Sequence, residues 1–355
     1  MSVKLSDAVA DVVSEIALPD EGVRMATQEL LDAKTKPRRS LGRIEDLACR
    51  IAAIRGTTSP GALAPAVVLA AGDHGIAEEG VSAYPQEVTG QMLLNFASGG
   101  AAICVLAAQA GARLVVVDAG TASDVAHPDI RDRRVGHGTA NSTRGPAMSA
   151  AEATRSLEIG IELVDELVAE GIGVIGIGEM GIANSTSAAA VCAALLPADP
   201  EQVCGRGTGI DDDGLARKVD AVARALQANP TRGEGSATLA GVGGFEIGVL
   251  AGVILGAASR RVPVVLDGFI TGAAALIAAR IAPACVGSMI ASHRSTEPGH
   301  RLVLEELGLV PLLKLDLRLG EGSGAALALP LVASSLAILS DMATFDQAGV
   351  TDAGA

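Results

Sequence analysis

The chain has 355 residues, of which 49% are apolar and 19% charged, and its formal net charge is −14 at pH 7. The apolar content excludes an intrinsically disordered chain, and the negative charge disfavours nonspecific binding to nucleic acid or to an anionic membrane. With no Trp, one Tyr and four Phe, the chain also lacks the aromatic surface on which single-stranded nucleic acids stack.

The N-terminal region predicts two helices. Apolar residues recur at helical spacing over residues 3–17, and a second periodic segment follows Ser40, which we expect to be its N-cap. The basic segment KTKPRRS, residues 34–40, is expected to form a turn between the two helices. Acidic residues stand where a signal peptide would be apolar, so we expect no secretion.

Short apolar runs that end in glycine and polar residues mark the next part of the chain. They occupy residues 65–75, 112–120, 171–181, 262–269 and 284–293, and Ala-rich helical stretches separate them. Continuous apolar strands that alternate with helices are typical of a parallel sheet covered by helices on both faces. The sequence therefore predicts an α/β fold.

Four acidic residues stand at the predicted strand ends: Asp73, Asp118, Glu179 and Asp267. The carboxyl ends of parallel strands meet at one edge of the sheet, where open α/β folds bind their ligands. We therefore expect these carboxylates to surround one crevice. The alternative for each of them is a helix-capping role.

The C-terminal region changes character. Leucines alternate with charged residues over 313–319, which predicts a half-exposed extended segment that leads to Glu321 between two glycines. The uncharged run 322–340 is barely long enough to span a bilayer and contains Pro330, so a buried helix is the better interpretation. The mean hydropathy of +0.40 keeps a membrane-associated helical protein open as an alternative.

A glycine-rich turn at residues 176–181, GIGEMG, satisfies G-x-G-x-x-G between a predicted strand and helix. The overlapping residues 171–176 also satisfy it, and no clear ribose-binding acid follows, which weakens the prediction of an NAD-dependent oxidoreductase. An anion site suits the turn better. Backbone amides near Gly178 would act there with Asn184, Ser185 and Thr186 at the next helix N-terminus.

A second glycine-rich loop, residues 205–214, precedes another helix. Amides at Gly207 together with Arg206, Arg217 and Lys218 would hold a phosphate, and a surface turn is the alternative. A metal site is not expected. His293, Glu297 and His300 are close in sequence, but Pro298 and Gly299 interrupt the helix face that they would need to share.

The five cysteines are scattered and form no CxxC pair. Buried free thiols in a reducing compartment are the expected state, which indicates a cytoplasmic protein.

Eight segments in order resemble nicotinate-nucleotide–dimethylbenzimidazole phosphoribosyltransferases. The resemblance extends from about residue 36 to 345, and its segments are KPRRSLGRIEDLA, AGDHGIAEEGVSAYPQEVT with NFASGGAAI, GEMGIANSTSAAA, GRGTGIDDDGLARK, VGGFEIGVLAGVILGAA, LDGFITGAAAL, SHRSTEPGH and LRLGEGSGAALAL. One small departure is Ala183, where the family often has a glycine.

The resemblance implies transfer of the 5-phosphoribosyl group from nicotinate mononucleotide to 5,6-dimethylbenzimidazole, with nicotinate and α-ribazole 5′-phosphate as products. This reaction belongs to the lower-ligand branch of cobalamin biosynthesis. The resemblance also implies a homodimer that needs no cofactor. The implied domains are a Rossmann-like α/β catalytic domain, residues 61–324, and a small helical domain formed by 1–60 with about 325–355.

The resemblance also implies roles for individual residues. Glu321 in LGEGSGA matches the catalytic base, Glu179 in GEMGI belongs to the active site, and Lys218 resembles the family's phosphate-site lysine. Leu319 and the segment 82–91 resemble parts of the base pocket. From that segment we expect the base to contact Ser82, Gln86 and Gln91.

These residues suit the implied chemistry. The leaving group of nicotinate mononucleotide is already a cationic pyridinium, so it requires neither a general acid nor a metal. The sugar becomes oxocarbenium-like, which a carboxylate such as Glu179 would stabilise, and the acceptor imidazole loses one proton to a base such as Glu321. A non-catalytic nucleotide- or base-binding module of the same fold remains an alternative.

Overall fold

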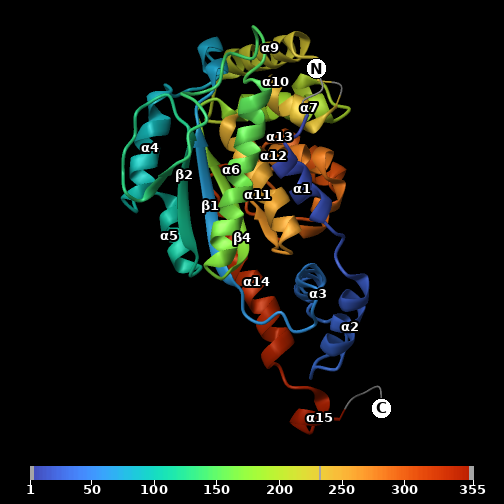
Figure 1. The fold of residues 1–355 in the computed structure, drawn as a ribbon. Coiled ribbons are helices and arrows are strands. Elements are labelled where there is room, and N and C mark those ends of the chain that lie inside the picture. The colour runs from blue at the N-terminus through green and yellow to red at the C-terminus, as the bar shows by residue number, and fades with distance from the viewer. Residues whose placement is uncertain (1–3, 232, 352–355) are drawn as a thin grey trace.

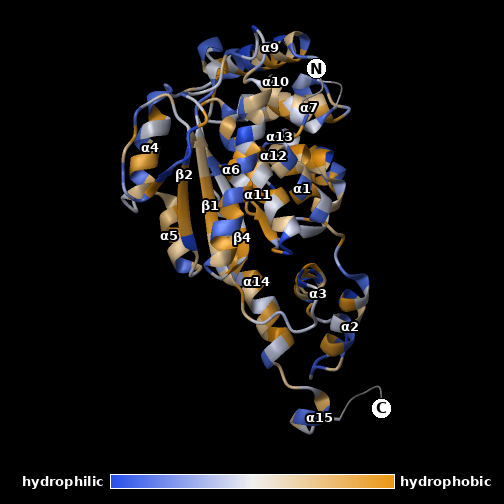
Figure 2. Cartoon of the chain, viewed as in Figure 1, coloured by the Kyte–Doolittle hydropathy of each residue, from blue (hydrophilic) through white to orange (hydrophobic). Residues whose placement is uncertain are grey.

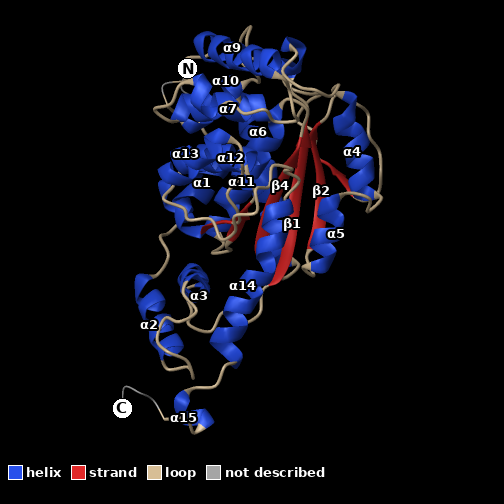
Figure 3. Ribbon diagram, turned by 180° about the vertical axis from the view of Figure 1, so that it is seen from behind, coloured by secondary structure: helices blue, strands red, loops and turns tan. Residues whose placement is uncertain are grey.

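The computed structural model describes residues 4–231 and 233–351. Its centre is one sheet of six parallel strands in the order β3-β2-β1-β4-β5-β6 (Figure 3). The strands are β1 Ala64–Gly72, β2 Arg113–Gly120, β3 Ile130–Asp132, β4 Ile172–Met180, β5 Val264–Leu266 and β6 Met289–Ala291. This strand order is that of Rossmann-like folds, so the predicted fold class is confirmed.

Helices cover both faces of the sheet (Figure 1). On one face lie α4 Glu87–Ala97, α5 Ala102–Gln109 and the first half of α14 Ser323–Asp341. The other helices of the α/β body are α6 Ala150–Ala169, α7 Asn184–Leu195, α8 Pro200–Val203, α9 Asp212–Ala228, α10 Gly235–Val242, α11 Phe245–Ser259, α12 Phe269–Ile281 and α13 Pro298–Glu306, with short 3-10 helices η1 Gly75–Glu79 and η2 Pro283–Ser288.

Strand β1 shows why both faces must be covered. Val68 and Ala70 point into the core beneath α6 and α11, whereas Val67 and Leu69 point into the opposite core beneath α5 and α14. Successive side chains of a strand alternate between faces, so a strand that is apolar at every position is stable only between two layers.

The N- and C-terminal regions meet at one end of the molecule. There α2 Glu21–Asp32 and α3 Arg43–Arg55 lie beside the second half of α14 and α15 Phe345–Ala348. Leu31, Cys49 and Leu339 form a separate small core, and Lys34 pairs with Thr344 in an isolated antiparallel bridge. We propose that this group is the small helical domain.

The first helix does not lie in that group. In α1 Asp7–Glu15, Ser6 caps the N-terminus and also donates a hydrogen bond to Glu158 of α6 at 2.8 Å, and Glu15 pairs with Arg260 beside α11. The expected small domain included residues 1–60. The structure differs from that expectation at α1, which packs on the α/β body. Residue 3, where the first helix was expected to begin, lies outside the described residues.

Two local predictions were wrong and one helix was missed. Ser40 is not an N-cap, because α3 begins at Arg43 after Gly42, which has a φ of +53°. Helix α2, capped by Asp20, was not predicted. In the run 284–293, the first half forms η2 and only three residues form β6.

By length and composition alone, two helical segments among the described residues could cross a membrane: 87–109 and α14. The first is two helices, α4 and α5, separated by a turn. More than half of the most apolar part of α14 is buried, as predicted for residues 322–340.

Candidate active site

A cavity of about 290 Å³ opens beyond the carboxyl ends of β4, β5 and β6. Its charged lining residues are three glutamates, Glu179, Glu297 and Glu321, and one arginine, Arg318, with His293 beside them. The remaining lining residues are Tyr84, Met180, Gly181, Ile182, Asn184, Ser185, Gly207, Thr208, Gly268, Phe269, Ile270, Ser295, Leu319 and Gly320.

Glu179 is the penultimate residue of β4 and is 5% exposed. Its carboxylate accepts a hydrogen bond from the Asn184 side chain at the start of α7. Burial, reinforced by the nearby Asp267 carboxylate, raises the pKa of Glu179 to about 8. The side chain is therefore mostly protonated at pH 7.

Glu321 faces Glu179 from a strained turn. Its φ is +63°, a left-handed conformation that is uncommon outside glycine, and its neighbours Gly320 and Gly322 have φ of +82° and +83°. The Glu321 amide donates to the carbonyl of Glu179 at 3.2 Å, which fixes the two residues together. Glycine suits position 320, because the φ of +82° disfavours other residues and a Cβ there would displace the Glu179 carboxylate.

The carboxylate of Glu321 is suited to accept a proton. Its Oε2 atom is buried and has no hydrogen-bond partner among the described residues. Burial raises the pKa of Glu321, and a backbone hydrogen bond from Ile103 partly opposes that rise. A buried carboxylate oxygen without a donor is costly unless a ligand supplies one.

The expectation that four carboxylates surround one crevice was wrong. Asp267 instead caps α14, because its oxygens accept from the amides of Gly322 and Gly324 at 3.1 and 2.7 Å. Burial raises the pKa of Asp267 to about 7, and these amides counteract part of that rise. Asp267 thus acts on the site indirectly, by holding the turn that carries Glu321.

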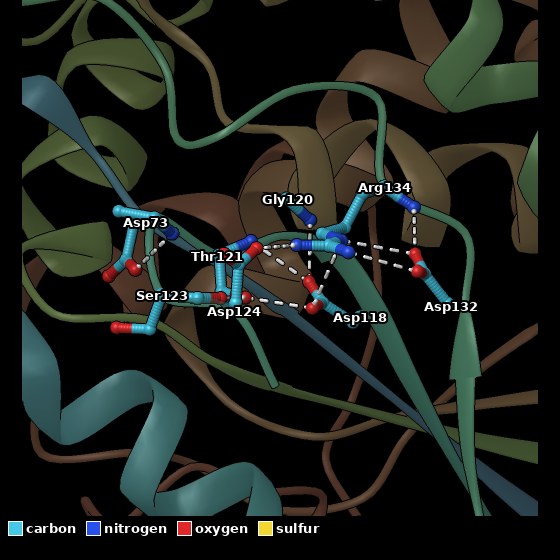
Figure 4. A network of polar contacts seen from close by, with 9 residues as sticks. Asp73, Asp118, Gly120, Thr121, Ser123, Asp124, Asp132 and Arg134 are labelled. Atoms are coloured by element: carbon cyan, nitrogen blue, oxygen red, sulfur yellow. Dashed lines mark hydrogen bonds and ion pairs between the residues drawn. The ribbon is translucent and has the colours of Figure 1, made fainter. Parts of the chain in front are cut away.

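Asp73 and Asp118 belong to a different polar network at the ends of β1 and β2 (Figure 4). Asp118 accepts from the amides of Gly120 and Thr121 at 3.0 and 2.9 Å, and Asp73 accepts from the amide of Ala122 at 2.8 Å. These carboxylates fix the loop after β2, so they neither line the cavity nor take the helix-capping role that was the alternative.

The N-terminus of α7 lies at the cavity wall. Asn184 and Ser185 line the cavity, whereas Thr186 is fully buried and its hydroxyl has no partner among the described residues. The preceding Ala183 has a φ of +72°, which explains why glycine suits this position.

Lys218 is almost completely buried behind this wall. Its ammonium donates to Ser185 Oγ at 2.9 Å and to the Gly205 carbonyl at 3.0 Å, and burial lowers its pKa. Gly207 lies against the same two side chains, since a Cβ there would be 2.7 Å from Ser185 Oγ and 3.3 Å from Lys218 Nζ. The Lys218 ammonium therefore places a positive charge directly behind Ser185, which lines the cavity.

The two predicted arginines of this region point elsewhere. Arg206 pairs with Asp212 and the Ile210 carbonyl within its own loop, and Arg217 points to the Gly80 carbonyl. Arg318 instead reaches the loop, where its Nη1 lies 3.4 Å from the carbonyl of Gly207.

The expected base-binding residues are only partly at the cavity. Leu319 lines it and is 57% exposed. Ser82 lies against Thr208, Gln86 donates to the His74 carbonyl at 3.1 Å, and the exposed Gln91 lies on α4. None of these three lines the cavity, and neither do Gly178, Thr186 or Lys218.

Tyr84, which lies in the predicted base-pocket segment 82–91, lines the cavity, whereas several other lining residues were not predicted as site residues, among them His293, Ser295, Glu297 and Arg318. Each lies within a segment that carries the family resemblance, which is the only sequence signal that could have identified them. Glu297 accepts from the Gly207 amide at 3.1 Å. Within residues 4–231 and 233–351, no group of three or more His, Cys, Asp or Glu side chains could hold a metal ion.

A model of a phosphoribosyltransferase family matches residues 16–350. The chain belongs to the nicotinate-nucleotide–dimethylbenzimidazole phosphoribosyltransferase family. The enzyme of that name from Chloroflexus aurantiacus is 51% identical over 348 residues, which cover 98% of this chain and 99% of the relative. The one from Desulforudis audaxviator is 48% identical over 349 residues, with 98% and 99% covered.

The crystal structure of CobT from Thermus thermophilus matches this phosphoribosyltransferase with a TM-score of 0.89 and 48% identity, covering 93% of this chain and 99% of that one. Family membership and geometry both disfavour an NAD-dependent oxidoreductase. The predicted glycine-rich turn at 176–181 is wrong, because residues 176–180 belong to strand β4, and Gly178 packs against the backbone of Glu321 and Gly322.

Proposed function

We propose that this enzyme transfers the 5-phosphoribosyl group from nicotinate mononucleotide to 5,6-dimethylbenzimidazole, with Glu321 as the base. The products are nicotinate and α-ribazole 5′-phosphate, so the reaction serves the lower-ligand branch of cobalamin biosynthesis. The observation that carries the assignment is the pair of facing glutamates. One of them, Glu321, has a buried oxygen that lacks a donor among the described residues.

Glu321 removes the proton of the acceptor. One imidazole nitrogen of dimethylbenzimidazole attacks the anomeric carbon while the other loses its N–H proton, which the free Glu321 oxygen accepts. The bond between the anomeric carbon and the pyridinium nitrogen breaks, and its electron pair leaves with nicotinate. Because that nitrogen is cationic in the substrate, its departure requires no protonation.

Glu179 stabilises positive charge on the sugar. As the pyridinium leaves, charge develops on the ribosyl ring, and a carboxylate in a water-poor cavity interacts with it more strongly than in water. Asn184 orients the Glu179 carboxylate through its hydrogen bond. The substrate's own positive charge favours the ionised form.

The phosphate is held where the N-terminus of α7, with Asn184, Ser185 and Thr186, meets the cavity. This terminus supplies the positive end of the helix dipole and the Ser185 amide, because the amides of Asn184 and Thr186 already donate to the carbonyls of Gly181 and Ala183. Lys218 acts through Ser185 and through the loop that carries Gly207. Gly178 leaves room for the turn that carries Glu321. It is not itself a phosphate ligand.

The dimethylbenzimidazole lies against Leu319 and Tyr84. Ser82 and Gln86 position this wall, since they bond to Thr208 and to the His74 backbone. Gln91 lies farther along α4 and does not line the cavity.

A direct assay tests the proposed reaction. Purified protein is mixed with nicotinate mononucleotide and dimethylbenzimidazole, and the products are separated by chromatography with mass detection. Equal amounts of nicotinate and α-ribazole 5′-phosphate are expected. Binding of both substrates without any product would contradict the proposal and favour a non-catalytic binding module.

Binding of nicotinate mononucleotide should release protons near pH 7. The pKa of Glu179 is about 8, and a pyridinium beside it lowers that pKa, so the side chain ionises on binding. The release should be present between about pH 5 and 8 and should vanish well above pH 8, where Glu179 is already ionised. Calorimetry in two buffers of different ionisation enthalpy measures it.

The matched control is Glu179→Gln, which keeps the shape of the protonated side chain and cannot ionise. The variant should bind the mononucleotide without this release. Equal proton release from the variant and the unmodified protein would remove Glu179 from the charge-stabilising role.

We propose that the enzyme is a cytoplasmic homodimer. The five cysteines are free thiols, four of them buried, in keeping with a reducing compartment. Apolar side chains are exposed along α4 and α5, including Leu94 and Val105, and Figure 2 colours parts of both helices as hydrophobic. Light scattering should give twice the 35.4 kDa chain mass, and the mass of one chain would contradict the dimer.

A further inference from the structure

A second cavity lies between the small helical domain and the α/β body. Its volume is about 460 Å³, and it shares no lining residue with the cavity that holds Glu321. It is formed by α2, α3, β6 and the loop after α13. The lining residues are Arg24, Arg43, Asp46, Leu47, Arg50, Ile290, Ala291, Gly308, Leu309, Val310 and Leu312.

Arg50 on α3 is the central charge of this cavity. Its Nη2 donates to the Val286 carbonyl at 3.1 Å, but its Nε is buried and has no hydrogen-bond partner in the described part of the chain. No carboxylate of the described residues forms an ion pair with Arg50, and burial lowers its pKa. Arg50 is partly buried, and a guanidinium without a counter-charge whose Nε is cut off from water is costly, so a bound anion would offset that cost.

Arg43 lies about two turns before Arg50 on the same helix. Its Nη2 donates to the Val310 carbonyl at 3.0 Å, and within the described ranges it too has no ion-pair partner. Arg24 is already neutralised by Glu21 of its own helix. Asp46 is the one acidic lining residue, so the two free guanidiniums leave a net positive charge in a protein whose formal charge is −14.

The rest of the lining is apolar. Leu47, Ile290 and Leu312 offer a hydrophobic wall beside the two guanidiniums, and the volume is that of a small-molecule site. Arginine binds phosphate oxygens in pairs of hydrogen bonds, and two arginines match a dianion. We propose that this cavity binds a phosphomonoester that carries an apolar group, separately from the transferase reaction.

Titration calorimetry with phenyl phosphate at low ionic strength tests the proposal. The unmodified protein should show two classes of site, one in each cavity. Arg43→Met and Arg50→Met should weaken one class about tenfold or more while the other is retained. Arg55→Met is the matched control, because Arg55 lies on the same helix outside the cavity, and it should leave both classes unchanged.

Thermal melting checks that the variants are folded. If the Arg50→Met variant fails to fold, the variant at the exposed Arg43, Arg43→Met, still gives the test. A single class of site in the unmodified protein, or equal weakening by Arg55→Met, would overturn the proposal. Equal affinity for benzoate or inorganic phosphate would overturn the assignment to an apolar phosphomonoester. Loss of dimers in Arg43→Met would show that a second copy fills the cavity, and would overturn it as well.

Discussion

Replacing Glu321 by Gln should lower turnover by about 10²–10⁴-fold, the usual contribution of a general base. The substitution keeps the size of the side chain and removes the carboxylate that accepts the acceptor's proton. Product formation under saturating substrates measures the loss, and binding of dimethylbenzimidazole should be largely retained. A folded variant with near-normal turnover would exclude Glu321 as the base.

The pH profile gives an independent check on Glu321. Burial raises the pKa of this carboxyl above the ordinary value of 4.5. Only the ionised form accepts a proton, so the rate should fall as the pH drops through that raised pKa. The part of the acidic limb that comes from Glu321 should be missing from the residual activity of Glu321→Gln, whereas the part that comes from Glu179 should remain.

Glu297→Gln serves as the control within the same cavity. Glu297 also lines the cavity, and like Glu321 it has a buried oxygen without a donor among the described residues, but its other oxygen accepts from the Gly207 amide beside the proposed phosphate site. Its replacement should change the KM for nicotinate mononucleotide more than the turnover number. Equal losses of turnover in Glu321→Gln and Glu297→Gln would indicate that turnover depends on the total negative charge of the cavity. Glu321 would then not be a specific base.

Gly178→Ala should reduce turnover about 10²-fold and destabilise the protein by roughly 1–3 kcal/mol. A Cβ at 178 would collide with the Gly322 amide and would lie 2.5 Å from the carbonyl carbon of Glu321. Both obstacles are backbone atoms, so the turn that carries Glu321 must move away from Glu179. Turnover and melting temperature measure the two effects.

Gly176→Ala is the matched control for Gly178→Ala. It lies two residues earlier on the same face of β4, but a Cβ there would be 3.3 Å from the side chains of Ala325 and Val67. Side-chain contacts of that length relax with small shifts, so most activity should remain. Similar losses in both variants would mean that strand packing is responsible, and that the position of Glu321 is not.

The sheet was predictable because its signal is local. Strands β1 and β4 are apolar at nearly every position, a pattern typical of strands that are buried on both faces. Each of these apolar runs ends in glycine and polar residues. Strands β5 and β6 were harder to delimit, since only three residues of each pair with their neighbours. Helix α2 was missed because its N-cap, Asp20, was not recognised as a helix start.

The site was predictable only where a sequence motif carries it. The resemblance pointed to Glu179 and Glu321. The structure brings the two residues together, since the Glu321 amide is bonded to the Glu179 carbonyl. The strand-end rule also selected Asp267, and there it was misleading. That carboxylate is satisfied by amides of α14, more than fifty residues later in the chain.

The sequence by itself determined the class of fold, the family and the two facing glutamates, because strand periodicity and short motifs are encoded within neighbouring residues. Only the tertiary structure decided which polar groups remain unpaired among the described residues. Lys218 was expected at the phosphate and is buried behind Ser185, whereas Arg50, which no motif marks, faces a cavity with its Nε unpartnered. Hydrogen bonding and burial depend on residues distant in sequence, so a one-dimensional pattern cannot fix them.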